Sequence, residues 1–212
     1  MLEQAQGRWG WRRSRLLVIG TVAAQLAVVL LFIGDEAPGA PAAARSISAG
    51  GNHTCALLPS GRVKCWGAND SGQLGLGSTT DQGDEAGEMH HLPTVDIGTG
   101  RTATAISAGS SHTCALLDNA TVKCWGNGTG GRLGQDNSAQ LGDQTGEMAA
   151  LNPINLGAGR TATAITAGDG HTCAVLDNAT VKCWGFGNRG QLGQDSTDTL
   201  GDSVGEMAAL PP

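Results

Sequence analysis

Alternating apolar and polar residues predict short β-strands over most of residues 45–212. Residues 112–117 place apolar side chains on both faces of an extended chain, which indicates a strand covered on both sides. No segment after residue 34 has the 3.6-residue period of an amphipathic helix. Four strands are expected within one stretch of the chain, at 101–106, 112–117, 121–125 and 152–156. The pattern predicts an all-β domain of short antiparallel strands.

This strand pattern occurs three times, at a spacing of 59 residues. Between residues 98–153 and 157–212, 40 of 56 aligned positions are identical. A fixed period of this kind is typical of supersecondary units that stack on one another. We therefore expect three repeats, at approximately 45–97, 98–156 and 157–212. Residues that recur in every copy are expected to be scaffold, among them His53, His112, His171, Trp66, Trp125 and Trp184.

Each repeat carries two cysteines separated by nine residues. If the segments around them form an antiparallel hairpin with a three-residue turn, Cys55 lies directly opposite Cys65. Opposed residues have Cα atoms about 4.5 to 5.5 Å apart, within the range that a disulfide tolerates. In an oxidising compartment the sequence predicts three disulfides, Cys55–Cys65, Cys114–Cys124 and Cys173–Cys183.

Zinc is the alternative use of these residues. His53 and Cys55 share one face of a strand, and Cys65 follows on the partner strand, which gives three ligands. No fourth ligand recurs within the repeat, and export favours oxidation of the thiols. We expect no metal and no cofactor.

The first 44 residues have the features of an export signal. Four arginines precede an apolar run of 19 residues at 16–34, and an Ala/Pro-rich linker follows at 35–44. Residues 1–34 are expected to form a hydrophobic helix, either a signal peptide cleaved after Ala44 or a signal anchor that remains in the membrane. Both alternatives predict that residues 45–212 are exported, to the extracellular space or the cell surface. Membrane contact is expected only through an uncleaved leader.

The charge balance of residues 45–212 argues against nucleic-acid binding. This part of the chain holds nine Lys or Arg and 16 Asp or Glu, a formal net charge of −7. Binding to a phosphate backbone requires clustered cations, which an acidic array does not provide.

Several short motifs recur in phase. A strand ending in Ala-Gly is followed by His-Thr-Cys-Ala, a turn and Lys-Cys-Trp-Gly, and then by Gly-Gln-Leu-Gly at 72–75 and 190–193. The middle copy departs at Arg132. This pattern resembles the regulator of chromosome condensation repeat over essentially all of residues 45–212.

The resemblance implies β-propeller-type repeats, here three blades of about four short antiparallel strands. The family forms seven-bladed propellers, and seven units of this length need more than twice the 168 residues that follow Ala44. The chain is therefore expected to be an open arc or partial propeller, a fragment of a longer product, or a unit that self-associates through its exposed edges.

Catalytic chemistry has little support in the sequence. Ser111 precedes His112, but Asn52 and Gly170 occupy the equivalent positions, so we expect no catalytic residue. The acidic loops, with Asp136, Asp143 and Glu147 in one copy and Asp195, Asp202 and Glu206 in another, either hold calcium or cap turns.

Function is expected where the copies differ. One variable stretch follows each Trp-Gly, at 68–71, 127–130 and 186–189, and a second lies at 78–82, 137–140 and 196–199. Phe186 and Arg189 are the main candidates for contact with a partner, since aromatic and arginine side chains dominate interface energetics; Arg132 and Asn69 are further candidates. The sequence thus predicts an exported, non-enzymatic scaffold that binds a protein through its loops. The resemblance leaves two alternatives: guanine-nucleotide exchange on a small GTPase, and inhibition of a secreted hydrolase such as a β-lactamase.

Overall fold

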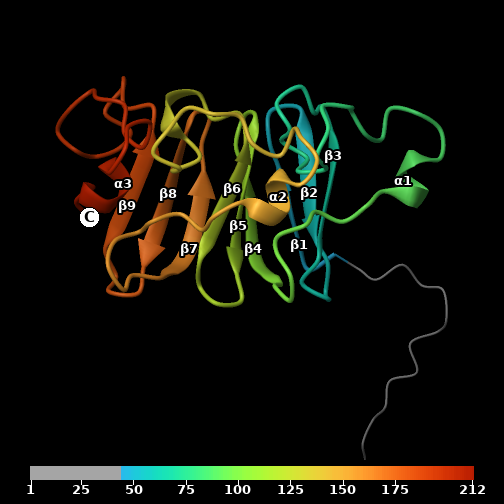
Figure 1. Cartoon of the computed structure of the whole chain (residues 1–212), viewed down its shortest axis with the longest axis horizontal. Coiled ribbons are helices and arrows are strands. Elements are labelled where there is room, and N and C mark those ends of the chain that lie inside the picture. Colours follow the sequence, from blue (N-terminus) through green and yellow to red (C-terminus); the bar gives the residue numbers. More distant parts are fainter. Residues whose placement is uncertain (1–43) are drawn as a thin grey trace, which may run out of the picture. The chain divides into compact units, whose positions relative to one another are not determined.

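The computed structural model describes residues 44–212, so the expected leader helix at 1–34 and nearly all of the linker at 35–44 lie outside the described residues. The described part is all-β, as predicted, and consists of three antiparallel sheets of three strands each, placed side by side (Figure 1). We call these sheets blades 1, 2 and 3. Their strands are β1 (Ser46–Ala49), β2 (His53–Leu57) and β3 (Val63–Gly67); β4 (Ala103–Ala108), β5 (His112–Leu117) and β6 (Val122–Gly126); and β7 (Ala162–Ala167), β8 (His171–Leu176) and β9 (Val181–Gly185).

The hairpin that joins the second and third strands of each blade has the predicted register. Cys55 lies opposite Cys65 with their Cα atoms 4.1 Å apart, and the other two pairs are arranged alike. All three expected disulfides are present, one in each blade. The turn needs one residue with a left-handed backbone, which is Gly61 (φ 76°) in blade 1 but Ala120 (φ 61°) in blade 2. Glycine adopts this conformation without strain, whereas alanine does not.

Each sheet has three strands, so the expectation of about four is corrected. The segment 152–156 lies beside β6 and makes one backbone hydrogen bond there, from the amide of Ile154 to the carbonyl of Val122 (2.8 Å). Blade 1 has the same single bond, from the amide of Val95 to the carbonyl of Val63 (2.9 Å). The predicted alternation is still present, since Ile154 and Leu156 are buried and Asn155 between them is exposed.

One short helix of a single turn follows the glycine of each Gly-Glu-Met motif. These helices are α1 (Glu88–His91), α2 (Glu147–Ala150) and α3 (Glu206–Ala209). A single turn is too short to produce a helical period, which explains why the sequence pattern does not predict it. The repeated glutamate holds the preceding turn. The Oε2 atom of Glu206 accepts hydrogen bonds from the amides of Gly201 (2.8 Å) and Ser203 (3.0 Å).

The hydrophobic cores lie between blades. One cluster combines Cys55, Leu57 and Val63 of blade 1 with Ala115 and Trp125 of blade 2. The second cluster joins blades 2 and 3 in the same way. Three blades therefore share two cores, and neither core belongs to a single blade.

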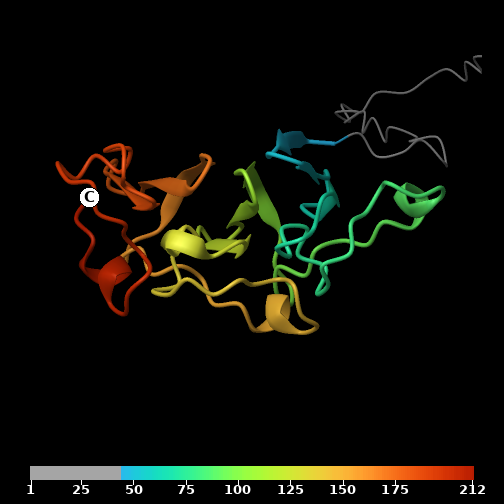
Figure 2. The same cartoon turned by 90° about the horizontal axis from the view of Figure 1, so that it is seen from above.

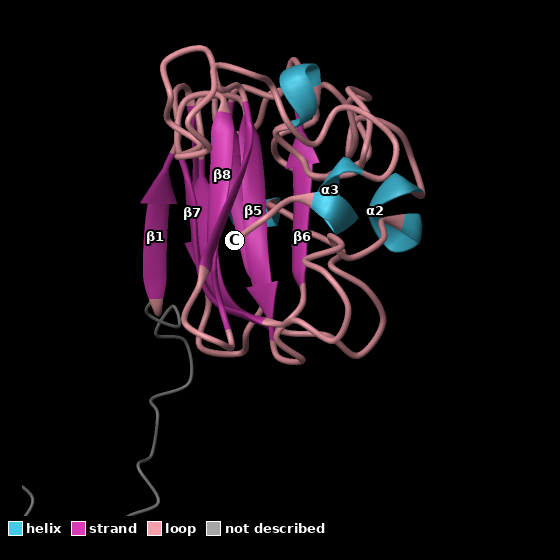
Figure 3. Ribbon diagram, turned by 90° about the vertical axis from the view of Figure 1, so that its left-hand side faces the viewer, coloured by secondary structure: helices cyan, strands magenta, loops and turns pink. Residues whose placement is uncertain are grey.

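The blades stack with equivalent strands in line. Viewed along the stack, β1 and β7 lie at one edge, β5 and β8 in the middle, and β6 and the short helices toward the opposite edge (Figure 3). The view from above shows the blades following one another, with α2 and α3 on the side away from β4 and β7 (Figure 2). Over residues 44–212, no helix is both long and apolar enough to cross a lipid bilayer.

Candidate protein-binding surface

The repeated histidine joins neighbouring blades. Nε2 of His53 lies 2.8 Å from Oγ1 of Thr113 in blade 2. That hydroxyl donates its hydrogen to the carbonyl of Gln73 in blade 1 (2.8 Å), and Nε1 of Trp125 donates to the same carbonyl (3.1 Å). Because the hydroxyl hydrogen is already used, Thr113 accepts from His53, whose Nε2 must carry the proton. We call this set of four groups the junction clasp.

A second clasp joins blades 2 and 3. His112 contacts Thr172 (3.0 Å), and the carbonyl of Arg132 accepts from Thr172 (3.0 Å) and from Nε1 of Trp184 (3.1 Å). His112, Thr172 and Trp184 are fully buried. Four of the recurring residues, His53, His112, Trp125 and Trp184, therefore act between blades rather than within one blade.

Burial keeps the clasp histidines uncharged. It lowers the pKa of His53 to about 4. For His112, burial and, less strongly, the positive charge of Arg132 lower the pKa to about 3. A neutral ring has one N–H to donate, which matches the single bond from each Nε2. The hydrogen bonds of the clasps therefore require the neutral form of each histidine.

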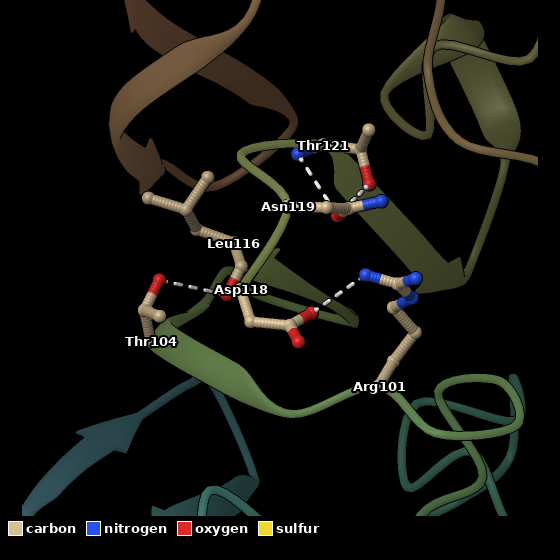
Figure 4. A network of polar contacts seen from close by, with 6 residues as sticks. All are labelled: Arg101, Thr104, Leu116, Asp118, Asn119 and Thr121. Carbon is tan, nitrogen blue, oxygen red and sulfur yellow. Dashed lines mark hydrogen bonds and ion pairs between the residues drawn. The ribbon is translucent and has the colours of Figure 1, made fainter.

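The two ends of each blade differ in how variable they are. The hairpin-turn end carries an ion pair between Arg101 and Asp118 (3.3 Å), and Arg160 and Asp177 repeat it in blade 3 (3.5 Å). Figure 4 shows the first pair beside Asn119, whose Oδ1 accepts from the hydroxyl of Thr121 (2.8 Å). Exposed ion pairs of this kind contribute about 0 to 1 kcal/mol. Repetition in adjacent copies indicates a scaffold role for this end.

The variable loops lie at the opposite end, beyond the last residues of β3, β6 and β9. In each blade the two variable stretches meet: the amide of Gly67 bonds to the carbonyl of Gln82 (2.7 Å), and the other blades repeat this bridge. Neighbouring blades touch here as well, since Nδ2 of Asn127 lies 3.4 Å from Oγ of Ser71. We call this end the loop surface. It comprises residues 68–82, 127–141 and 186–200.

Asn69 organises its own loop. Its Nδ2 donates to the carbonyls of Ser78 (2.7 Å) and Thr80 (3.0 Å), and its Oδ1 accepts from the amide of Leu74 (3.0 Å). The side chain is fully buried. The structure therefore places this partner-contact candidate out of reach of a partner.

Phe186 and Arg132 face each other across the junction of blades 2 and 3. The guanidinium carbon of Arg132 lies 5.1 Å from the centre of the Phe186 ring, a cation–π distance. Arg132 is buried and donates from Nε to the carbonyl of Thr129 (2.9 Å). Phe186 fills space left by two glycines, because a Cβ at Gly130 or Gly170 would overlap its ring. Their contact spans the two blades.

Arg189 is the candidate whose side chain is exposed. Its amide bonds to Oε1 of Gln191 (2.7 Å), which fixes the backbone of the loop. The neighbouring Asn188 is exposed too. Of the four candidate contact residues, Arg189 is the one that is exposed on the loop surface, and Phe186 is half-buried.

Residues considered for zinc, calcium or catalytic chemistry have other partners in the described structure. All six cysteines are oxidised, which leaves no thiolate for zinc. Asp136 accepts from the amide of Met207 in the next blade (2.8 Å), and Glu147 holds its own turn. Within residues 44–212, no three His, Cys, Asp or Glu side chains come together to hold a metal. His112, next to Ser111, is committed to Thr172.

The partners of the repeated residues were not predicted from the sequence. Thr113 and Thr172 recur in the sequence beside the histidines, and Asp136 caps α3 of the following blade. The sequence did indicate that the threonines are constrained, because the dipeptide His-Thr recurs in all three repeats. It did not reveal that the bonds run from one repeat to the next.

Comparison with known proteins agrees with this architecture. A protein-family model described as "Regulator of chromosome condensation (RCC1) repeat" matches residues 44–73, 103–132 and 162–191. A second family model of the same repeat matches residues 60–116. The chain is 33% identical over 165 residues to the ultraviolet-B receptor of Arabidopsis thaliana, which covers 77% of this chain and 34% of the receptor. It is 32% identical over 154 residues to the regulator of chromosome condensation of Drosophila melanogaster, covering 73% of this chain and 26% of that protein. The chain thus spans about a third or less of the length of these relatives.

A solved structure has the same fold. Prp20p of Saccharomyces cerevisiae superposes with a TM-score of 0.52 at 22% identity, over 71% of this chain and 34% of that one. The three matched repeats coincide with the three blades that the structure contains. The chain belongs to the family of proteins built from the regulator of chromosome condensation repeat.

Proposed function

We propose that this chain is an exported, non-enzymatic scaffold that binds a protein partner through the loop surface. The observation that carries the proposal is the division of each blade. The hairpin turn and its ion pair are the same in blades 2 and 3, and the histidine, threonine and tryptophan of the clasps recur, whereas the variable stretches at 127–130 and 137–140 and their counterparts lie together in the loop surface. A rigid frame that presents variable loops is the arrangement from which many binding surfaces are built.

The chemistry of the loop surface suits a protein partner. Its exposed side chains are mostly small and polar, among them Asp70, Thr80, Thr129, Asn188 and Arg189. Interfaces of this composition have a polar rim, with arginine supplying a large share of the binding energy. Arg189 is the proposed anchor.

Relatives support binding in general but do not select a partner. One relative is a receptor and another a probable E3 ubiquitin-protein ligase of Homo sapiens, so the repeat serves different activities. Prp20p has binding properties to Gsp1p and histones. Because one fold serves many functions, the proposal rests on this chain's loops.

Export is part of the proposal. Disulfides persist in oxidising compartments, and all cysteines of the described residues are paired. The apolar run at 16–34, preceded by arginines, supplies the corresponding targeting feature.

The experiment uses the full chain in its native cells with a membrane-impermeant crosslinker. The test variant is Asn188→Thr with Arg189→Gly, which gives blade 3 the residues of the blade 2 loop. The matched control is Val204→Thr, which copies Thr145 at another exposed, variable position. We expect one protein to crosslink to the native chain and to the control, and at least about tenfold less to the test variant. Absence of any crosslinked partner, or equal crosslinking of both variants, rejects the proposal.

A further inference from the structure

The end faces of the stack are the two halves of the interface that joins its blades. In the middle blade every residue of β5 is buried, because a blade covers each side. In β8 of blade 3, Thr172, Ala174 and Leu176 are buried, while His171, Cys173 and Val175 are not. In β2 of blade 1 the faces are reversed, so that Thr54 is half-exposed and His53 and Cys55 are buried. Within residues 44–212, no blade covers the histidine face of blade 3 or the threonine face of blade 1.

Exposed apolar side chains gather on these end faces. Among the described residues, five large apolar side chains are exposed, and four of them belong to the end faces. Ile47 (66% exposed) and Met89 (48%) are on blade 1, and Val175 (37%) and Val181 (47%) are on blade 3. The fifth, Val204 (95%), lies in a surface loop. The equivalents of Val181, which are Val63 and Val122, are fully buried by the next blade.

We propose that the histidine face of blade 3 binds the threonine face of blade 1 in a second copy of this chain. The occupant is a second copy because each end face is the complement of the other, and the internal junctions show twice how the faces fit. A head-to-tail contact of this kind uses different patches on the two partners and closes into a ring or continues as a filament. Two copies of residues 44–212 supply six blades, within the four to eight with which propellers close. The expected assembly is a closed ring of two chains.

The polar groups of the internal junctions are retained on both end faces. His171 is the counterpart of His112, and Thr54 that of Thr172, which supplies the first clasp bond. The carbonyl of Gln191 is the counterpart of the Arg132 carbonyl and meets Nε1 of Trp66 in place of Trp184. All the groups of a third clasp are therefore present, divided between two ends of one chain.

Two further contacts have counterparts. Oγ of Ser107 accepts from the amide of Ala167 (2.8 Å), and Oγ1 of Thr166 offers the same acceptor to blade 1 of the second copy. Oδ1 of Asp136 accepts from the amide of Met207 in α3, and the exposed Asp195 is placed to do so for Met89 in α1. In the proposed contact Ile47 takes the place of Ile165, which packs against the core between blades 2 and 3.

The experiment measures the mass of the full chain over a concentration series, by sedimentation equilibrium in one mild detergent. The same detergent and amino-terminal segment are kept for every variant. Ile47→Asp places a charge on the blade 1 face, and Val181→Asp places one on the blade 3 face. Val204→Asp is the matched control, since it adds the same charge at an exposed valine away from both faces. We expect the native chain and the control to form two-chain assemblies, and each end-face variant to associate at least about a hundredfold more weakly.

Mixing the two end-face variants tests the head-to-tail geometry. Ile47→Asp retains an intact blade 3 face, and Val181→Asp retains an intact blade 1 face, so one intact junction forms only between unlike variants. We expect the mixture to recover two-chain species that neither variant forms alone. A native chain that stays monomeric, a control as weak as the end-face variants, or a mixture without recovery overturns the proposal. Intact near-ultraviolet circular dichroism and the absence of free thiols confirm that each variant is folded.

Discussion

One threonine hydroxyl at each junction connects two groups, a histidine ring and a backbone carbonyl. Oγ1 of Thr172 accepts from the ring of His112 and donates to the carbonyl of Arg132, and the methyl group lies in a fully buried position. Replacement by valine keeps the shape but removes both bonds. The N–H of His112 is then buried without an acceptor, which costs more than the bond itself contributes.

Thr172→Val is therefore expected to lower the free energy of unfolding by about 1 to 3 kcal/mol. Thr54→Val is the matched control, because Thr54 has the same sequence context but no blade among the described residues beside it, and its expected effect is within about 0.5 kcal/mol. Urea unfolding at a dilution where the monomer predominates measures both. Equal losses would show that the hydroxyl acts within its own blade.

The clasp histidines make stability depend on pH. The pKa of His112 is lowered to about 3 by burial, whereas in the unfolded chain it is about 6.5. As pH falls through 6.5 the unfolded chain takes up the proton first, so the stability present above this pH is lost below it. Because of His112 alone, the free energy of unfolding is expected to fall by about 2 kcal/mol between pH 7 and pH 5. His53 is expected to lower it further over the same range.

Urea unfolding of the native chain and of His112→Gln at pH 7 and pH 5 checks this. The variant is less stable at pH 7, because its amide does not reproduce the clasp. Between pH 7 and pH 5, the free energy of unfolding of His112→Gln is expected to fall by about 2 kcal/mol less than that of the native chain. A loss as large as that of the native chain would assign the pH dependence to other groups.

At the scale of elements, the hairpin with its disulfide is the unit that the sequence determines most directly. Cys55, Cys65 and the turn between them lie within 11 consecutive positions, so a single turn length fixes the register. The turn residue is less predictable. Ala120 takes a left-handed backbone (φ 61°) that glycine usually provides, and only its alignment with Gly61 indicates this.

The fourth strand and the clasps were both missed because a side-chain pattern does not report which groups pair. Segment 152–156 keeps the alternation of a strand, but its bond to β6 is the single one from the amide of Ile154 to the carbonyl of Val122. The clasp joins His53 to Thr113, 60 positions apart, and Thr113 to Gln73, 40 positions apart. Repetition shows that a residue is constrained, but not whether its partner is in the same blade or the next.

The three disulfides differ in their surroundings although their hairpins are alike. Cys114 and Cys124 are fully buried between blades 2 and 3, whereas Cys173 and Cys183 are half-buried on an end face. A reductant must reach the sulfur, so in dilute solution, where the monomer predominates, mild reduction followed by alkylation and mass spectrometry is expected to label Cys173 and Cys183 first. Labelling of Cys114 and Cys124 at the same rate would contradict the burial of that pair.

Replacing each disulfide pair distinguishes two contributions to stability, the closed loop that the disulfide makes and the packing of its sulfur atoms. Replacing Cys173 and Cys183 together by alanine is expected to cost about 2 to 3 kcal/mol, the value for a closed loop of this length. The same replacement of Cys114 and Cys124 also leaves a gap in a core and is expected to cost about 1 to 2 kcal/mol more. Thermal unfolding of the two double variants at one pH gives the comparison. An equal cost would show that the core closes over the lost sulfurs.

At the scale of the whole molecule, stability resides in the junctions. Two cores serve three blades, so a blade removed from its neighbours exposes the apolar face on which it depends. Arrays of this type behave as a sum of units and nearest-neighbour contacts. The middle blade has two such contacts and each end blade has one.

Amide hydrogen exchange of the full chain tests this distribution. We expect β5, buried along its whole length, to exchange most slowly, and β1 and β9 to exchange faster because each lies in an end blade. In dilute solution the ordering should hold whether or not chains associate. At higher concentration a head-to-tail contact would slow exchange in β2 and β8 together, since these two strands provide the opposing faces, while the hairpin turns at Asn119 stay unchanged. The control is Val181→Asp, in which β8 and β2 should exchange at the dilute rate at every concentration. Exchange that is equal in all three blades would mean that each blade is stable by itself, and the account of stability through shared cores would then be wrong.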